Sequence, residues 1–358
     1  MPTAVLDMMD RRPIWAMPEW VPAEIRAALP SDWDLVVIDE ATDGSGDGAA
    51  RVSASVLEAV AAAEIYFGYG IPGQLLEAGG ALRWVHSGAA GVGSSLTPQM
   101  LASEVVFTNS AGIHAEPMAE TVIGMILFFG RGLDLAVSNQ GASAWDTNPY
   151  YRAGAPLSEL SMSTVGVIGF GGIGREVARR AAGLGARVIG LKRGPVRPED
   201  AALSALGGGG SLASRIDVVS GTEGLHRLLA ESDVLVLAAP ETERTRGMID
   251  APAFQRMKQG ALLVNVARGK LVDEDALVAA LTEGRLRGAG LDVFAKEPLA
   301  SDHALWALPN VLVTPHVSAV TRGFWRRETR LILHDLDCFL RGAEPHEWRN
   351  RVDKGAGY

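Results

Sequence analysis

Several residue types and patterns are scarce in this 358-residue chain, and each scarcity excludes a class of protein. The single cysteine, Cys338, rules out an internal disulfide and a cysteine-rich cluster, so we expect core packing for it and no metal ion. No run of 18 apolar residues occurs, and no apolar stretch follows a basic start, so we expect a cytoplasmic protein without a membrane span or secretion signal. Lysine and arginine total 33 against 42 acidic residues, which argues against nucleic-acid binding.

Apolar residues are plentiful: they make up 47% of the chain, enough for a sizeable core, and the length suits two domains. Short apolar strands alternate with helix-like segments in two series, which predicts two parallel sheets with helices on both faces. The first series has expected strands at 35–38, 64–67, 82–86 and 105–108. The second has expected strands at 164–169, 187–192, 216–219, 233–238, 261–266, 288–292 and 311–313.

Three segments lie outside this alternation. Residues 115–137 are apolar on most sides and predict one long helix, buried in a domain or in a subunit contact. Residues 194–222 are poorly patterned and predict a surface insertion. A helix at about 325–340 is expected to pack back on the first domain, so that residues 113–316 form a domain inserted into one made of 1–112 and 317–358.

The segment TVGVIGFGGIG at 164–174 is the most informative part of the sequence. A β-branched run leads into a glycine turn, an amphipathic helix follows, and RVIGL at 187–191 is the next strand. In that setting G-x-G-x-x-G predicts a dinucleotide site, because the glycines permit a tight turn and close approach of a pyrophosphate to the helix N-terminus. The residues expected to bind the dinucleotide here are Gly169, Gly171, Gly172, Ile173 and Gly174.

The end of the second strand of this unit bears on the choice of cofactor. An NAD-binding domain of this kind usually places an acidic residue there to bind the ribose 2′-hydroxyl. This chain has Lys192 and then Arg193, and no carboxylate before Glu199. Two cations attract a 2′-phosphate, so we expect NADP(H) to be preferred, with NAD(H) as the alternative.

Three later strands each end in a polar residue that suits chemistry on an acid. These are Arg268, Glu297 and His316, in the segments ALLVNVARGKLVDED, GAGLDVFAKEP and VLVTPHVSAVT. Ligands of doubly wound sheets bind outside the carboxyl ends of the strands, so we expect the three side chains to face the same crevice as the nucleotide. The other six histidines are not accompanied by a comparable set of residues at strand ends, and we interpret them as structural or solvated.

These segments, in this order, resemble the D-2-hydroxyacid dehydrogenase family. The resemblance rests on GFGGIG, LAAPETERTRGMI, LLVNVARGKLVDEDAL, GAGLDVFAKEPL and TPHVSAVT, and it covers about residues 64–358. It implies a Rossmann-type nucleotide domain inserted into a flavodoxin-like substrate domain, a homodimer, and reduction of a small 2-keto acid to a D-2-hydroxy acid. Further cofactor contacts that it implies are Ala239, Pro240, Ala267 and Asp292.

The resemblance also implies a role for each catalytic candidate. His316 would be the general acid and base, Glu297 would hold the other ring nitrogen, and Arg268 would bind the substrate carboxylate. The segment SGAAGVG at 87–93 resembles the family's carboxylate-binding turn, with the amides of Ala90 and Gly91 toward the substrate, although Gly93 stands where many members have an aspartate.

Two other functions remain open from the sequence. A nucleotide-sensing protein on the same scaffold would bind the cofactor without significant turnover, but it would not need all three of Arg268, Glu297 and His316. A formate or phosphite enzyme is a related alternative, and Glu297 disfavours formate because the carbon dioxide product needs no paired acid.

Overall fold

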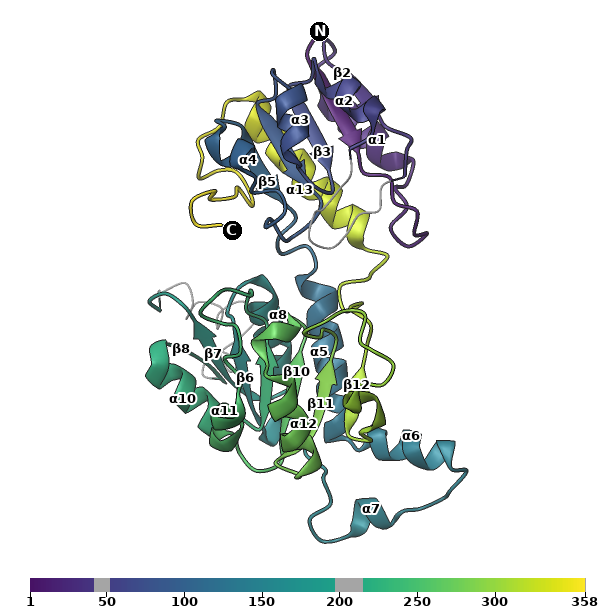
Figure 1. Ribbon diagram of the computed structural model, residues 1–358, viewed down its shortest axis with the longest axis vertical. Helices are drawn as coiled ribbons and strands as arrows, with labels where there is room; N and C mark the ends of the chain where they lie inside the picture. The colour runs from purple at the N-terminus through teal and green to yellow at the C-terminus, as the bar shows by residue number, and fades with distance from the viewer. Residues whose placement is uncertain (42–51, 197–214, 358) are drawn as a thin grey trace. The chain divides into compact units, whose positions relative to one another are not determined.

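The computed structural model describes residues 1–41, 52–196 and 215–357. The chain divides into two compact units, Met1–His114 with Val320–Tyr358 and Ala115–Ala319 (Figure 1). Most of the expected surface insertion, including Glu199, lies outside the described residues.

The first unit contains a five-stranded sheet in which every pair is parallel. Its order is β2-β1-β3-β4-β5, the flavodoxin-like order. The strands are β1 (Thr3–Asp7), β2 (Asp34–Val37), β3 (Ile65–Gly68), β4 (Trp84–Ser87) and β5 (Val106–Asn109). The four expected strands are confirmed to within two residues. The sequence analysis did not identify β1, a five-residue segment that lies between β2 and β3 and is almost wholly buried.

Helices cover both faces of this sheet. On one face, α1 (Trp20–Ala28) and α13 (Phe324–Leu340) share an apolar cluster with β1, β3 and β4. On the other face lie α2 (Ala54–Val60), α3 (Gly73–Ala78) and α4 (Pro98–Ala102). The last long helix of the chain therefore completes the core of the unit that the first 114 residues begin.

The second unit contains a seven-stranded parallel sheet of order β12-β11-β10-β9-β6-β7-β8. Counted within the unit, this is 7-6-5-4-1-2-3, the Rossmann order extended by one strand. The strands are β6 (Thr164–Ile168), β7 (Arg187–Lys192), β8 (Ile216–Ser220), β9 (Val234–Leu237), β10 (Ala261–Asn265), β11 (Leu286–Leu291) and β12 (Val311–Val313). All seven expected strands are confirmed to within two residues.

Two apolar clusters hold the helices of the second unit to its sheet. One contains residues of α5 (Ala115–Gly130) and α8 (Gly172–Gly183). The other contains residues of α10 (Gly221–Glu231), α11 (Ala251–Arg256) and α12 (Glu274–Thr282).

The expectation of one helix over residues 115–137 is wrong. Helix α5 ends at Gly130, and α6 (Leu133–Gly141) starts after a bend of 70°. Gly132 causes the break: its φ is +68°, and a Cβ there would lie 2.8 Å from Leu157 Cδ2. No single helix among the described residues is long and apolar enough to cross a membrane, and the bent pair α5 and α6 meets that test only jointly.

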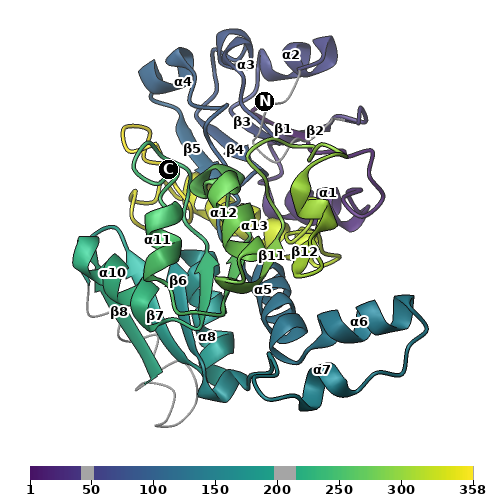
Figure 2. The same ribbon diagram turned by 60° about the horizontal axis from the view of Figure 1, so that its bottom comes forward.

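Helix α6 and the short α7 (Asn148–Tyr151) stand off from the sheet of the second unit (Figures 1 and 2). This arm carries large apolar side chains in water: Val137 is 58% exposed, Trp145 98% and Tyr151 85%. The apolar segment predicted for a subunit contact is thus divided: much of α5 packs in the core of the second unit, and the arm exposes large apolar side chains.

Candidate active site

The turn between β6 and α8 has the geometry that the glycine pattern predicts. Gly169 has φ +96°, and a Cβ there would lie 2.5 Å from the Ala239 nitrogen. A side chain at Gly174 would collide with the carbonyl of Gly169, so the helix packs directly on the turn. By contrast, nothing lies within 4 Å of a Cβ built at Gly171, the residue before α8, so the backbone is open to close approach there. A pyrophosphate fits such a helix N-terminus.

The other expected cofactor residues follow the carboxyl ends of neighbouring strands. Lys192 is the half-buried last residue of β7, and Arg193 follows it in water. Ala239 and Pro240 come after β9, and Ala267 comes after β10. Because β6, β7, β9 and β10 are parallel and adjacent in one sheet, these residues lie along the same sheet edge as the glycine turn.

Glu297 and His316 are brought together although they follow different strands. His316 Nδ1 lies 2.8 Å from Glu297 Oε2, and the amide of Phe294 donates to Glu297 Oε1 at 3.0 Å. A carboxylate only accepts hydrogen bonds, so Nδ1 carries a proton and Nε2 is left to exchange one. The imidazole is 47% exposed, so a ligand can reach it.

The loop that carries His316 is held by the buried carboxylate of Asp292, which directly follows β11. Asp292 Oδ1 accepts from Thr314 Oγ1 at 2.6 Å and from Val317 N at 2.9 Å, and Oδ2 accepts from Ser318 N at 3.0 Å. The Asp292 carbonyl accepts from His316 N at 2.9 Å. His316 has a φ of +55°, which is unfavourable for a side chain of this size, and these bonds hold it there. The contact of Asp292 with the nicotinamide remains a prediction.

Arg268 follows β10 in a turn that the Asn265 side chain holds at both ends. Asn265 Nδ2 donates to the Arg268 carbonyl at 3.1 Å, and Asn265 Oδ1 accepts from Ala267 N at 3.0 Å. A side chain at Gly269 would collide with the backbone of Phe294, so this turn packs against the segment that leads to Glu297. The Arg268 side chain is half-buried, and its Nη1 donates to the Ala267 carbonyl at 2.7 Å.

Two residues that support this edge are not predicted from the sequence. Asn265 ends β10, and Glu274 Oε1 accepts from Ala295 N at 2.7 Å from the first turn of α12. The polar Asn265 within NVARG was the one signal that could have pointed to a turn held by a side chain.

In the first unit, the segment after β4 presents two backbone amides on one side. The Ala89 carbonyl accepts from Ser110 N at 3.3 Å, and the Ala90 carbonyl accepts from Asn109 Nδ2 at 2.8 Å. In a trans peptide the N–H points away from the preceding C=O, so the amides of Ala90 and Gly91 are turned away from Asn109 and Ser110. Neither amide donates a hydrogen bond within the described residues, and Ala90 is exposed. A pair of such amides can bind a carboxylate.

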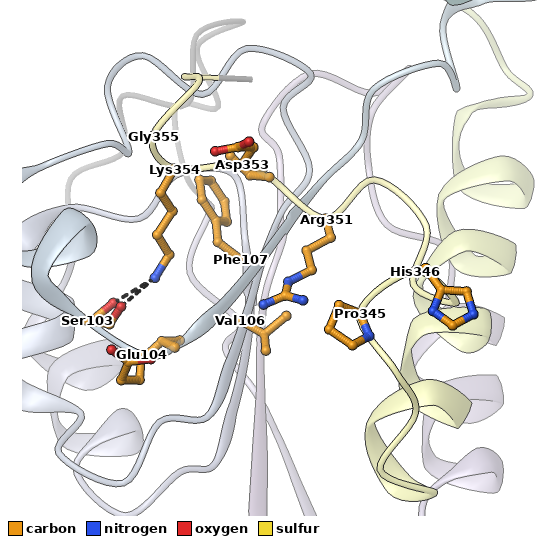
Figure 3. Close-up of a pocket in the computed structure, with 12 residues that line it drawn as sticks. Ser103, Glu104, Val106, Phe107, Pro345, His346, Arg351, Asp353, Lys354 and Gly355 are labelled. Atoms are coloured by element: carbon orange, nitrogen blue, oxygen red, sulfur yellow. Dashed lines mark hydrogen bonds between the residues drawn. The ribbon is translucent and has the colours of Figure 1, made fainter.

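A separate cavity of about 640 Å³ lies beside the C-terminal tail in the first unit (Figure 3). Its basic residues Arg351, Lys354 and His346 are accompanied by the acidic Glu104 and Asp353. Lys354 extends to Ser103, donating to its carbonyl at 2.8 Å, and burial lowers the pKa of this lysine. The cavity holds none of the residues that the sequence analysis selected for chemistry.

Comparison with known proteins identifies relatives of this chain. The model of the D-isomer specific 2-hydroxyacid dehydrogenase family, NAD binding domain, matches residues 123–318. A glyoxylate reductase of Thermococcus gammatolerans is 33% identical over 279 residues, which is 77% of this chain and 78% of that protein. An (S)-sulfolactate dehydrogenase of Chromohalobacter salexigens is 36% identical over 61% of this chain and 65% of its own length.

Two solved structures cover the whole chain. One is a D-isomer specific 2-hydroxyacid dehydrogenase from Xanthobacter autotrophicus Py2 in complex with NADPH and MES, with a TM-score of 0.74, 26% identity and coverage of 100% of this chain and 99% of that chain. The other is an NADPH-dependent glyoxylate/hydroxypyruvate reductase from Sinorhizobium meliloti in complex with NADP and sulfate, with a TM-score of 0.74, 25% identity and full coverage of both chains.

The chain therefore belongs to the D-isomer specific 2-hydroxyacid dehydrogenase family. It is an oxidoreductase of 2-hydroxy acids that works with a nicotinamide dinucleotide.

Proposed function

We propose that this protein is an NADP(H)-preferring reductase of small 2-keto acids that forms D-2-hydroxy acids with His316 as the proton donor. The observation that carries the proposal is the hydrogen bond between His316 Nδ1 and Glu297 at 2.8 Å, which leaves Nε2 for the substrate. The structural neighbour from Sinorhizobium meliloti is described as an NADPH-dependent glyoxylate/hydroxypyruvate reductase, which supports both the substrate class and the cofactor.

The residues of the second unit divide the reaction among them. When bound, the nicotinamide supplies the hydride that reaches the keto carbon. His316 Nε2 donates a proton to the keto oxygen, so that hydride and proton together convert the C=O into CH–OH. Glu297 keeps the Nδ1 proton and offsets the charge that the ring carries before donation. Arg268 binds the substrate carboxylate with two parallel N–H groups and polarises the keto group.

The amides of Ala90 and Gly91 would bind the substrate carboxylate, as the family resemblance implies. Their carbonyl neighbours are tied to Asn109 and Ser110, so the amides are oriented before the substrate arrives. Preorganised donors of this kind need no rearrangement when the anion binds.

The cofactor preference rests on Lys192 and Arg193 at the end of β7. The ribose 2′-phosphate of NADP(H) would take charge-assisted hydrogen bonds from these cations, each worth about 1.5–3 kcal/mol. The Lys192→Asp, Arg193→Ser variant should shift the ratio of kcat/KM from NADPH toward NADH. If the unmodified protein already uses NADH as well as NADPH, the proposed preference is wrong.

The proposed reaction is tested by NADPH oxidation against glyoxylate, hydroxypyruvate, and longer and aromatic 2-keto acids. We expect turnover with at least one of them and a D-configured product by chiral chromatography. Tight NADPH binding without oxidation by any member of the panel would instead favour a nucleotide-sensing protein.

We also propose a homodimer in which the arm formed by α6 and α7 contacts a second copy. The arm exposes the large apolar side chains of Val137, Trp145 and Tyr151, and contact with a second copy would remove that surface from water. Light scattering after size-exclusion chromatography should give the mass of two chains, and Val137→Glu with Trp145→Ser should give the mass of one.

A further inference from the structure

A chain of buried polar side chains lies in the first unit, and the reaction described above does not use it. His86 on β4, Thr108 on β5, Ser110 after β5 and Glu328 on α13 are all fully buried. His86 Nδ1 lies 2.8 Å from Thr108 Oγ1, and His86 Nε2 lies 2.9 Å from Glu328 Oε1. Ser110 Oγ lies 2.7 Å from Glu328 Oε2 and 3.0 Å from the Ser87 carbonyl.

The neighbouring donors determine where the protons lie. Trp84 Nε1 can only donate, and it donates to Thr108 Oγ1 at 2.9 Å, so the threonine hydroxyl proton is available to His86 Nδ1. His86 Nε2 then carries the ring proton and donates it to Glu328. The Glu328 carboxylate accepts one hydrogen bond from the imidazole and another from the Ser110 hydroxyl. The Ser110 oxygen also lies near the Ser87 carbonyl.

This chain of bonds ends at the segment that presents the two amides. The Ser87 carbonyl is the last of β4, and Ser110 N donates to the Ala89 carbonyl two residues further on. Ser87 Oγ accepts from Ala89 N at 3.3 Å. Gly88, between them, packs so closely that a Cβ would lie 3.1 Å from the Tyr69 ring. Ser110 thus contacts the segment through both its hydroxyl and its amide, and Glu328 determines where Ser110 sits.

We propose that Glu328, with His86 behind it and Ser110 in front of it, is a positioning residue that sets the Ala90 and Gly91 amides for the substrate carboxylate. The inference rests on the proposed function, because it concerns the same carboxylate. None of the three side chains touches substrate; each acts through the next.

The energetics favour a role beyond holding the fold together. A buried carboxylate costs several kcal/mol in desolvation, and replacing an entire buried polar network by apolar side chains of similar volume is often neutral or stabilising. A fully bonded network instead restricts neighbouring groups to one arrangement. A substrate loop benefits from that restriction, since a carboxylate then binds amides that are already aligned.

The test compares Glu328→Gln and Ser110→Ala with Asp335→Asn as a matched control. Asp335 lies two turns further along α13, is equally buried, and accepts from Arg349 N at 2.8 Å rather than from the segment after β4. The measurements are kcat, KM for the best keto acid, KM for NADPH, thermal unfolding, and the Kd of oxamate, a non-reducible keto-acid mimic, with NADPH bound.

We expect Glu328→Gln and Ser110→Ala to raise the keto-acid KM and the oxamate Kd by about tenfold, the effect of one or two lost hydrogen bonds. Their kcat and NADPH KM should stay within about twofold of the unmodified protein, because the second unit is untouched. Asp335→Asn should leave both substrate constants unchanged. Should Glu328→Gln not fold, Ser110→Ala, which removes a single oxygen, decides alone.

Unchanged keto-acid KM and oxamate Kd in both variants would overturn the positioning role while leaving the proposed function intact. The positioning role would also be overturned if the variants, Asp335→Asn included, lost kcat, keto-acid affinity, NADPH affinity and unfolding temperature together. That result would show that the network is merely structural. If the unmodified protein reduces no keto acid and binds no oxamate, the proposed function itself fails and this inference with it.

Discussion

Asp292 in the second unit and Glu328 in the first are both fully buried carboxylates that support a loop at the carboxyl edge of a parallel sheet. Asp292 holds its loop directly, through two backbone amides and one hydroxyl. Glu328 reaches its loop indirectly, through the side chain of Ser110. The first loop carries His316, and the second presents two amides.

The difference between the two carboxylates fits the role that we propose for each loop. A general acid must hold one ring nitrogen within reach of one substrate atom, so its backbone is tied by short, direct bonds. An anion site built from amides needs only the correct orientation of two peptide N–H groups, and a network of side chains can fix that orientation. Damage to the second unit's edge should therefore lower kcat, and damage to the first unit's edge should raise the keto-acid KM.

The largest effect should come from His316→Gln. Loss of the proton donor removes a contribution of about 10²–10⁴-fold to kcat. The Kd of NADPH, measured by fluorescence, should be unchanged because the glycine turn lies on another loop. Near-normal kcat in this variant would contradict the contrast between the two units, because the sheet edge of the second unit would then not supply the proton donor.

Arg268→Ala should come next, with a fall in kcat/KM of about 10²–10³-fold from the loss of two charge-assisted hydrogen bonds. Arg268→Lys is the matched variant: it keeps the charge and loses the planar fork, so it should recover only part of the rate. Equal activity of the two variants would show that geometry at this position is irrelevant.

Asp292→Asn sharpens the contrast with Glu328→Gln. The asparagine nitrogen cannot accept from Ser318 N or Val317 N, so the His316 loop should loosen and kcat should fall by about tenfold. The keto-acid KM should change little. If Asp292→Asn raised the keto-acid KM and left kcat unchanged, the assignment of kcat effects to the second unit and KM effects to the first would be refuted.

The smallest effect concerns Asp335, whose pKa is raised by burial and only partly lowered by its bonds to Arg349 N and His334. An acid with a raised pKa in the folded state contributes stability that is full below its unfolded pKa, about 3.9, and is lost as pH rises through the folded value. Asp335→Asn removes that loss, so the unfolding temperature of the variant relative to the unmodified protein should rise as the pH is increased from 4 to 7. A constant difference across that range would contradict the prediction.

The strands and site residues of the second unit can be predicted from the sequence more completely than those of the first unit. All seven strands of the second unit and the strand-end positions of Arg268, Glu297 and His316 follow from local apolar runs and their polar ends. The hydrogen bond between Glu297 and His316 joins residues 19 apart, within one sheet edge that the pattern defines.

The first unit was predicted less completely, for physical reasons. Strand β1 was missed because five residues at the chain start carry no alternation or turn signal. In the second unit, the break at Gly132 was missed because apolar residues resume directly after it. The bonds from Glu328 to Ser110 and His86 span 218 and 242 residues, and no local pattern marks such partners.

Helix α13 has a consequence for the order in which the protein folds during synthesis. Phe324, Ile332 and Leu336 belong to the apolar cluster of the first unit, yet they are translated after the entire second unit. On the ribosome, Ala115–Ala319 is complete while Met1–His114 still lacks one of the two helices that cover one face of its sheet, so the unit that is begun first is finished last. A chain truncated after Ala319 should show this under limited proteolysis: the later segment should resist digestion, and residues 1–114 should be cleaved.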